Sequence, residues 1–226
     1  MSTVRLAVLV CMLAATLPAA AANPVTPATE EQKLSYAVGV LFGRNMSLEL
    51  DVDVDAFVQG IRDVLEGNDL RLPPEEMRAV VERYQAKQEK ERAAEADRNL
   101  AASRQFLEAN KKKDGVKELP GGVQYKVLQE GKGPKPTLND TVVVHYRGTL
   151  IDGKEFDSSY SRGEPATIPL ANVIKGWQDA VTAMPVGSKW EVYLPPQLAY
   201  GDRGAGPDIG PNSTLIFQIE LLDIAR

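Results

Sequence analysis

The stretch TVVVHY at residues 141–146 decides the fold class of the C-terminal half, because a short run of β-branched and aromatic residues is typical of a β-strand. Comparable runs recur before and after it, and turn signals such as Asp152-Gly153 separate them. One short helical stretch, residues 177–184, interrupts them. This order predicts an α+β domain in which an antiparallel sheet packs on one short helix. The further strand runs are residues 123–128, 189–194 and 215–222.

A long charged segment precedes these strands. From Glu75 to Asp114 the sequence holds no Gly or Pro, and charges of both signs alternate along it. A helix that is polar on every side usually runs through solvent between domains. A coiled coil is the alternative, but apolar heptads do not persist through residues 87–98. We therefore expect a long solvent-exposed connecting helix over residues 73–114, followed by a C-terminal domain over residues 115–226.

Two shorter amphipathic helices are predicted upstream of this connector, because apolar residues recur there at three- and four-residue spacing. Two helices of this size bury too little surface alone to offset the entropy that their chain loses. We therefore expect residues 30–72 to form an all-α dimerisation domain that pairs with a second copy of itself. Its apolar residues are Leu34, Val38, Leu41 and Phe42 in the first helix, and Val54, Phe57, Val58, Ile61, Val64 and Leu65 in the second.

The first 22 residues have the features of a signal peptide. Arg5 provides a positive charge, residues 6–17 are apolar, and Ala20-Ala21-Ala22 offers a cleavage site. A membrane anchor needs about 20 apolar residues, which this run lacks, so we expect no transmembrane anchor. The mature chain is expected to be exported, with a disordered segment over residues 23–29.

Composition excludes several classes of protein. The 226 residues include 26 Lys and Arg against 31 Asp and Glu, which gives a net charge of −5 and argues against a nucleic-acid partner. The chain has one Cys, Cys11, and one His, His145. These counts exclude a disulfide scaffold, a Cys/His zinc site and a Cys-His nucleophile. We expect neither a metal nor a cofactor.

Five short blocks follow one another between residues 122 and 226. They are VVHYRG (143–148), GKEFDSS (153–159), VIKGW (173–177), LAYG (198–201) and the closing strand (215–222). In this order and spacing they resemble the signature of FKBP-type peptidyl-prolyl cis-trans isomerases. The LSYAVG sequence at residues 34–39 and the long charged helix are similar to those of the macrophage infectivity potentiator (Mip-like) subfamily. The resemblance covers nearly the whole mature chain.

This resemblance implies an apolar pocket between the sheet and the short helix, with Trp177 as its floor. Asp157 is the charged group expected inside, paired with Arg162 and hydrogen-bonded to the Tyr146 hydroxyl. The residues expected to act in catalysis are Tyr146, Phe156, Asp157 and Tyr200. Those expected to bind substrate are Arg162, Val173, Ile174 (through its backbone N–H), Trp177, Ile209 and Phe217.

The resemblance also implies a function, that of an exported isomerase and chaperone that accelerates X-Pro rotation in folding proteins. An apolar pocket would bind the twisted amide without a covalent intermediate. The implied setting is the periplasm of a Gram-negative bacterium, with outer-membrane association, secretion and a role in virulence left open. Expected partners are unfolded proline-containing proteins, a second copy of the chain, and inhibitory macrolides of the tacrolimus and rapamycin type.

Some alternatives stay open at this point. Ala166 and Ala205 stand where small members of the family often carry an aromatic residue and a histidine, which predicts a more open pocket rim. The pocket could serve a holdase or adhesion module only as a peptide-binding site. A purely structural dimer is the third alternative, and the intact set of pocket residues argues against it.

Overall fold

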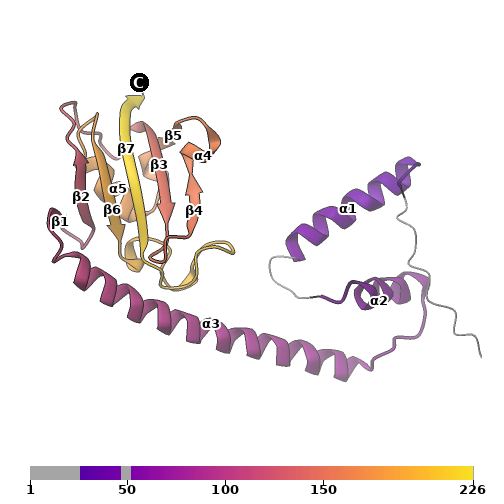
Figure 1. Ribbon diagram of the computed structural model, residues 1–226. Helices are drawn as coiled ribbons and strands as arrows, with labels where there is room; N and C mark the ends of the chain where they lie inside the picture. Colours follow the sequence, from indigo (N-terminus) through magenta and orange to yellow (C-terminus); the bar gives the residue numbers. More distant parts are fainter. Residues whose placement is uncertain (1–25, 47–51, 226) are drawn as a thin grey trace, which may run out of the picture. The chain divides into compact units, whose positions relative to one another are not determined.

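The computed structural model describes residues 26–46 and 52–225, so the expected signal peptide lies outside the described residues. The chain divides into two compact units within helix α2, after Ile61. Helices α1 (Glu30–Met46), α2 (Val54–Glu66) and α3 (Pro74–Asn110) come first, and an α+β domain follows (Figure 1). No helix in the described part of the chain is long and apolar enough to cross a membrane.

Seven strands of the described chain form one sheet in which every strand pair is antiparallel. Their order is β1-β2-β6-β7-β3-β4, and β5 pairs with β3. The TVVVHY stretch lies in β3, which pairs with β7 along its whole length. The strands are β1 (Val116–Glu118), β2 (Gln124–Gln129), β3 (Thr141–Thr149), β4 (Glu155–Ser158), β5 (Ala166–Pro169), β6 (Lys189–Leu194) and β7 (Leu215–Ala225).

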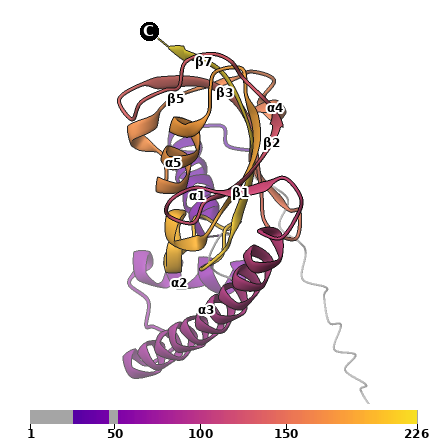
Figure 2. The ribbon, with the colours of Figure 1, turned by 90° about the vertical axis from the view of Figure 1, so that its left-hand side faces the viewer.

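Helix α5 (Lys175–Ala183) covers one face of this sheet (Figure 2). Trp177, Ala180 and Val181 on this helix are buried in the same apolar cluster as the alternate β3 residues Val144 and Tyr146. Period-two alternation sends these β3 side chains to a single face. The prediction of an α+β domain with an antiparallel sheet on one short helix is confirmed.

Helices α1 and α2 are capped by local hydrogen bonds. The Thr29 hydroxyl accepts from the Gln32 N–H at 3.2 Å, and the Gln32 side chain accepts from the Thr29 N–H at 3.3 Å, a reciprocal capping box. The Asp53 carboxylate caps α2 by accepting from the Ala56 N–H at 2.9 Å. Many apolar side chains of the two helices stay exposed. Contiguous exposed apolar side chains of this kind mark a site of contact with another surface.

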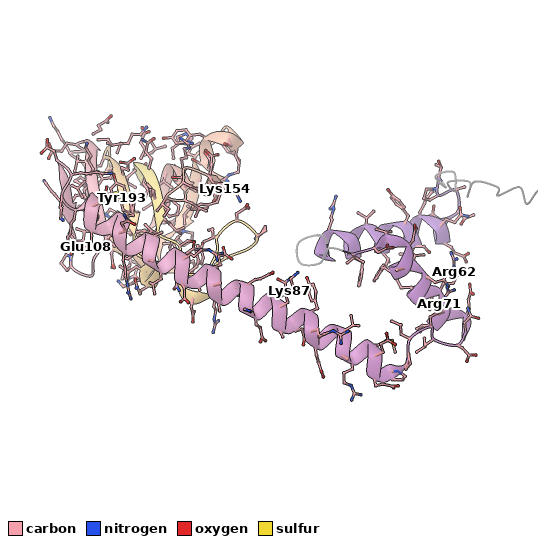
Figure 3. The ribbon with its side chains drawn as sticks, turned by 60° about the horizontal axis from the view of Figure 1, so that its bottom comes forward. Arg62, Arg71, Lys87, Glu108, Lys154 and Tyr193 are labelled. Atoms are coloured by element: carbon pink, nitrogen blue, oxygen red, sulfur yellow. The ribbon has the colours of Figure 1, made fainter. Side chains whose placement is uncertain are left out.

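Helix α3 is 37 residues long, so it spans roughly 55 Å at 1.5 Å per residue. Its C-terminal half differs from the expected solvent-exposed connector, because Ser103 is 2% exposed and Asn110 is fully buried. The Asn110 amide donates to the Gln124 side chain at 3.0 Å, and the Phe106 ring lies 6.0 Å from that of Tyr193. Figure 3 labels Tyr193 and the helix residue Glu108 at this end of α3. The half of α3 that holds these residues is therefore packed on the α+β domain.

Candidate active site

A cavity of about 470 Å³ opens between the sheet and helix α5. Nine of the ten residues expected at the site line it, and the tenth, Arg162, contacts two of these from outside. The lining residues that were expected are Tyr146, Phe156, Asp157, Val173, Ile174, Trp177, Tyr200, Ile209 and Phe217.

Four aromatic rings form the base and one wall of the cavity by meeting edge to face. The Trp177 ring lies 5.3 Å from the Tyr146 ring and 5.4 Å from the Phe217 ring, at nearly right angles to both. The Phe156 ring meets Phe217 in the same way at 5.5 Å. Edge-to-face pairs are a preferred aromatic geometry, so each ring restricts its neighbour. The wall is consequently rigid and apolar.

Gly148 in β3 makes room for this wall. A Cβ atom at this position would stand 2.6 Å from the Phe156 ring and 2.8 Å from the Phe217 ring. Real side chains essentially never approach so closely, and packed interiors have little spare volume. The glycine is therefore required where two pocket rings lie directly over the strand.

The polar corner of the cavity is a closed set of hydrogen bonds. The Tyr146 hydroxyl donates to one oxygen of Asp157 at 2.5 Å, and Arg162 donates to the other at 2.6 Å. Arg162 also donates to the Tyr146 oxygen at 2.8 Å. Short helix α4 (Ser159–Arg162) brings Arg162 back over Asp157, and Gly163 ends it in the left-handed conformation at φ 80°.

These contacts set the charge of each group. Burial acts to raise the pKa of Asp157, but hydrogen bonds from Tyr146 and Arg162 outweigh it and hold the pKa below its usual value. Burial, together with the hydrogen bond to Asp157, raises the pKa of Tyr146. At neutral pH the site therefore holds a carboxylate whose two oxygens are both occupied and a neutral phenol. Neither group is a free base or nucleophile.

Two hydrogen-bond donors at the cavity have no protein partner in the described part of the chain. The Ile174 backbone N–H lies at the N-terminus of α5, where no side chain caps the helix. Tyr200, 41% exposed, stands at the mouth of the cavity with its hydroxyl unpaired there. Helix N-termini present unsatisfied N–H groups that can donate hydrogen bonds to oxygen atoms of a ligand. Both donors are available to a carbonyl group inside the cavity.

Ile168 and Asn172 also line the cavity, and the sequence analysis missed them. Ile168 comes from β5, where it alternates with the more exposed Thr167 and Pro169, a pattern that could have placed it. No pattern in the sequence marks Asn172. Ala166 and Ala205 are not among the residues that line this cavity. The expectation of an open rim at these two alanines stays a prediction.

Comparison with known proteins identifies the family of the chain. Residues 133–222 match the family described as FKBP-type peptidyl-prolyl cis-trans isomerase, and residues 31–127 match the domain amino terminal to it. The chain is 46% identical over 211 residues to the peptidyl-prolyl cis-trans isomerase Mip of Coxiella burnetii, covering 91% of this chain and 92% of that protein. It is 42% identical to the outer membrane protein MIP of Legionella longbeachae over 219 residues, covering 95% and 94% of the two chains.

The crystal structure of FkpA from Escherichia coli is similar to this one with a TM-score of 0.62 at 38% sequence identity, covering 87% of this chain and 97% of that chain. The two family matches together span the helical N-terminal region and the domain that holds the cavity. The chain therefore belongs to the Mip-like FKBP-type peptidyl-prolyl cis-trans isomerases, enzymes that interconvert the isomers of X-Pro peptide bonds.

Proposed function

We propose that the protein is an exported isomerase and chaperone that accelerates X-Pro rotation in folding proteins, and that the cavity does so by binding the twisted amide. The observation that carries the mechanism is an apolar, aromatic cavity in which Asp157, the one ionised group among the described lining residues, is occupied by Tyr146 and Arg162. Such a site can bind and orient an amide but supplies no group for covalent chemistry.

The energetics of amide rotation suit this site. Rotation breaks amide resonance and costs roughly 18–20 kcal/mol, so X-Pro bonds exchange over tens to hundreds of seconds. The twisted amide has lost much of its charge separation and therefore needs water less than the planar form. An apolar cavity then binds the twisted form better than the planar one. A 10⁴-fold acceleration requires a difference of about 5.5 kcal/mol.

The residues have separate roles in this proposal. The proline ring rests on Trp177, between Tyr146 and Phe217. The Ile174 N–H donates to a substrate carbonyl, and the Tyr200 hydroxyl donates a second hydrogen bond. Asp157 and Arg162 hold the Tyr146 wall in place through charge-assisted hydrogen bonds. Macrolides of the tacrolimus and rapamycin type would inhibit by filling the same cavity.

The proposed homodimer rests on the exposed faces of α1 and α2. Leu34 is 67% exposed and Leu65 is 80% exposed, with several more apolar residues alongside them. Burial of apolar surface stabilises by roughly 25 cal/mol per Å², and a symmetric dimer buries the same patch twice. Two isomerase domains on one dimer would favour an unfolded chain as substrate. The name of the Legionella longbeachae relative as an outer membrane protein supports export to the periplasm or beyond.

One experiment separates isomerase from chaperone. Asp157→Val removes the carboxylate that Tyr146 and Arg162 share, and it should lower the rate on a short X-Pro peptide. Suppression of aggregation of an unfolded protein should stay unchanged, because that activity uses the dimer and its surfaces. A full-rate Asp157→Val enzyme would contradict the assigned pocket, and equal loss of both activities would contradict two separable functions.

A further inference from the structure

A single loop supplies two walls of the cavity and lies outside the sheet. The pocket loop, residues 199–214, connects the end of β6 to β7 and carries Tyr200 and Ile209 (Figure 1). Ile209 is 8% exposed although its neighbours Pro207 and Asp208 are exposed. Its burial in the cavity wall therefore depends on how the whole loop is held.

The loop makes few hydrogen bonds that would fix it by itself. Ala205 and Ile209 exchange two backbone hydrogen bonds, of 2.8 and 3.2 Å, and the Asn212 N–H donates to the Gly201 carbonyl at 2.7 Å. These bonds close the loop on itself but do not attach it to the sheet. On one side, Lys154 forms an ion pair with Asp208 at 2.8 Å. Exposed pairs of this kind hold a loop weakly.

Helix α3 holds the loop from the other side. The Ser103 hydroxyl donates to the Asn212 carbonyl at 2.8 Å and accepts from the Thr214 N–H at 3.1 Å. The Asn99 amide donates to the Pro211 carbonyl at 2.8 Å. Two turns further back, Arg92 donates to the Arg203 carbonyl at 2.6 Å. These side chains recur at three- to four-residue spacing with Ala96, so they lie on one helix face.

The helix and the loop also meet at close range. A Cβ atom at Gly210 would stand 2.2 Å from a Glu95 carboxylate oxygen and 3.0 Å from the Asn99 amide nitrogen. Gly210 directly follows Ile209, the loop residue in the cavity wall. Asn212, which the helix contacts through Ser103 and Ala96, has a φ of 55° in the left-handed region. The helix thus contacts the loop next to the cavity wall and at Asn212, a non-glycine residue in the left-handed region.

We propose that Asn99 and Ser103 of α3 are positioning residues for the isomerase site, which hold the pocket loop so that Ile209 and Tyr200 face the substrate. The proposal rests on the proposed role of the cavity and adds to it a dependence on the preceding helix. A loop that is ordered before substrate arrives binds it without the entropy loss of ordering. Releasing the loop should therefore weaken substrate binding more than it slows rotation of the bound amide.

The test uses the full chain with two changes of nearly constant shape. Asn99→Asp removes the donor to Pro211, and Ser103→Ala removes the hydroxyl between Asn212 and Thr214. The matched control is Gln105→Glu, the same amide-to-carboxylate change at an exposed position of the same helix.

Two measurements are made on each variant. Steady-state kinetics on a short X-Pro peptide give kcat and KM, and limited trypsin digestion gives the rate of cleavage after Arg203 in the loop, followed by mass spectrometry. The Asn99→Asp/Ser103→Ala double variant should raise KM about five- to tenfold, with kcat within about twofold, because the three hydrogen bonds that it removes help to order the loop. The double variant should be cut faster after Arg203, and Gln105→Glu should match the parent in every measurement.

Three outcomes would overturn the proposal. Unchanged cleavage and unchanged KM would show that α3 does not hold the loop. Faster cleavage with unchanged KM would show that the cavity does not depend on the loop being held. A fall in kcat alone would show that the contacts act on the rotation step. Phe156→Ala in the same assay tests whether the cavity is the isomerase site, because Phe156 lines the cavity and lies outside the pocket loop. Failure of the cavity assignment is therefore distinguishable from failure of this proposal.

Discussion

Gly148→Ala introduces one methyl group behind the pocket wall. The new Cβ would stand 2.6–2.8 Å from ring atoms of Phe156 and Phe217, about 1 Å inside normal contact. Phe217 is 5% exposed and packed against Trp177, whereas Phe156 is only partly buried. Phe156 is therefore the ring that moves, and the cavity is the space open to it. Overpacking of this kind costs about 1–3 kcal/mol of folding stability.

The expected loss of activity follows from the position of that ring. If displacement of Phe156 removes about 1.4–2.8 kcal/mol of binding to the twisted amide, kcat/KM falls about ten- to a hundredfold. Phe156→Leu in the Gly148→Ala background removes the two nearest ring atoms and leaves the 2.8 Å contact with Phe217, so folding stability should recover in part while activity stays low. The assay is kcat/KM on a short X-Pro peptide beside a urea unfolding curve. Parent-like activity of Gly148→Ala, with intact stability, would refute the reasoning.

Three further predictions concern protonation, the polar corner and assembly. Between about pH 5 and pH 8, kcat/KM on a peptide without titratable groups should stay constant, because the pKa of Asp157 is held below its usual value and that of Tyr146 is raised; a bell-shaped profile in this range would contradict it. Ionised Asp157 stabilises the folded state above the unfolded Asp pKa of about 3.9, and this stability is lost as the pH falls through the lower pKa of Asp157 in the folded state. Arg162→Ala removes one cause of that lower pKa, so acid unfolding followed by circular dichroism should shift to higher pH. Light scattering should find a dimer for residues 23–226 and a monomer for Leu34→Asp/Leu41→Asp, since both side chains are more than half exposed on α1; a monomeric parent would contradict the assembly.

The α+β domain could be predicted from the sequence because its signals are local and apolar. β3 alternates residues such as Val144 and Tyr146 toward the core, and α5 presents Trp177 and Val181 to the same cluster. The resemblance then brought together residues as distant as Tyr146 and Ile209, and the structure places both at one cavity. The roles of these residues in catalysis stay predictions.

The docking of α3 could not be predicted from the same signals. Apart from Phe106, the side chains named in its contact face are the polar Arg92, Asn99, Ser103 and Asn110, which leave no hydrophobic periodicity to detect. These side chains bind backbone carbonyls and a glutamine amide, partners that only the folded loop and strand bring into place. From the sequence alone a polar helix face is expected to be solvated, because its hydrogen-bond acceptors are brought into place only by the tertiary structure.

The most direct test of the central claim compares the parent chain with Phe156→Ala and Tyr200→Ala. Both side chains line the cavity, and Tyr200 is 41% exposed at its mouth, so neither truncation should unfold the domain. The measurement is kcat/KM for cis–trans exchange of a short X-Pro peptide, with near-ultraviolet circular dichroism as the control for folding. An apolar cavity that binds the twisted amide predicts a loss of about tenfold or more in each variant. Parent-like kcat/KM in both correctly folded variants would contradict the account.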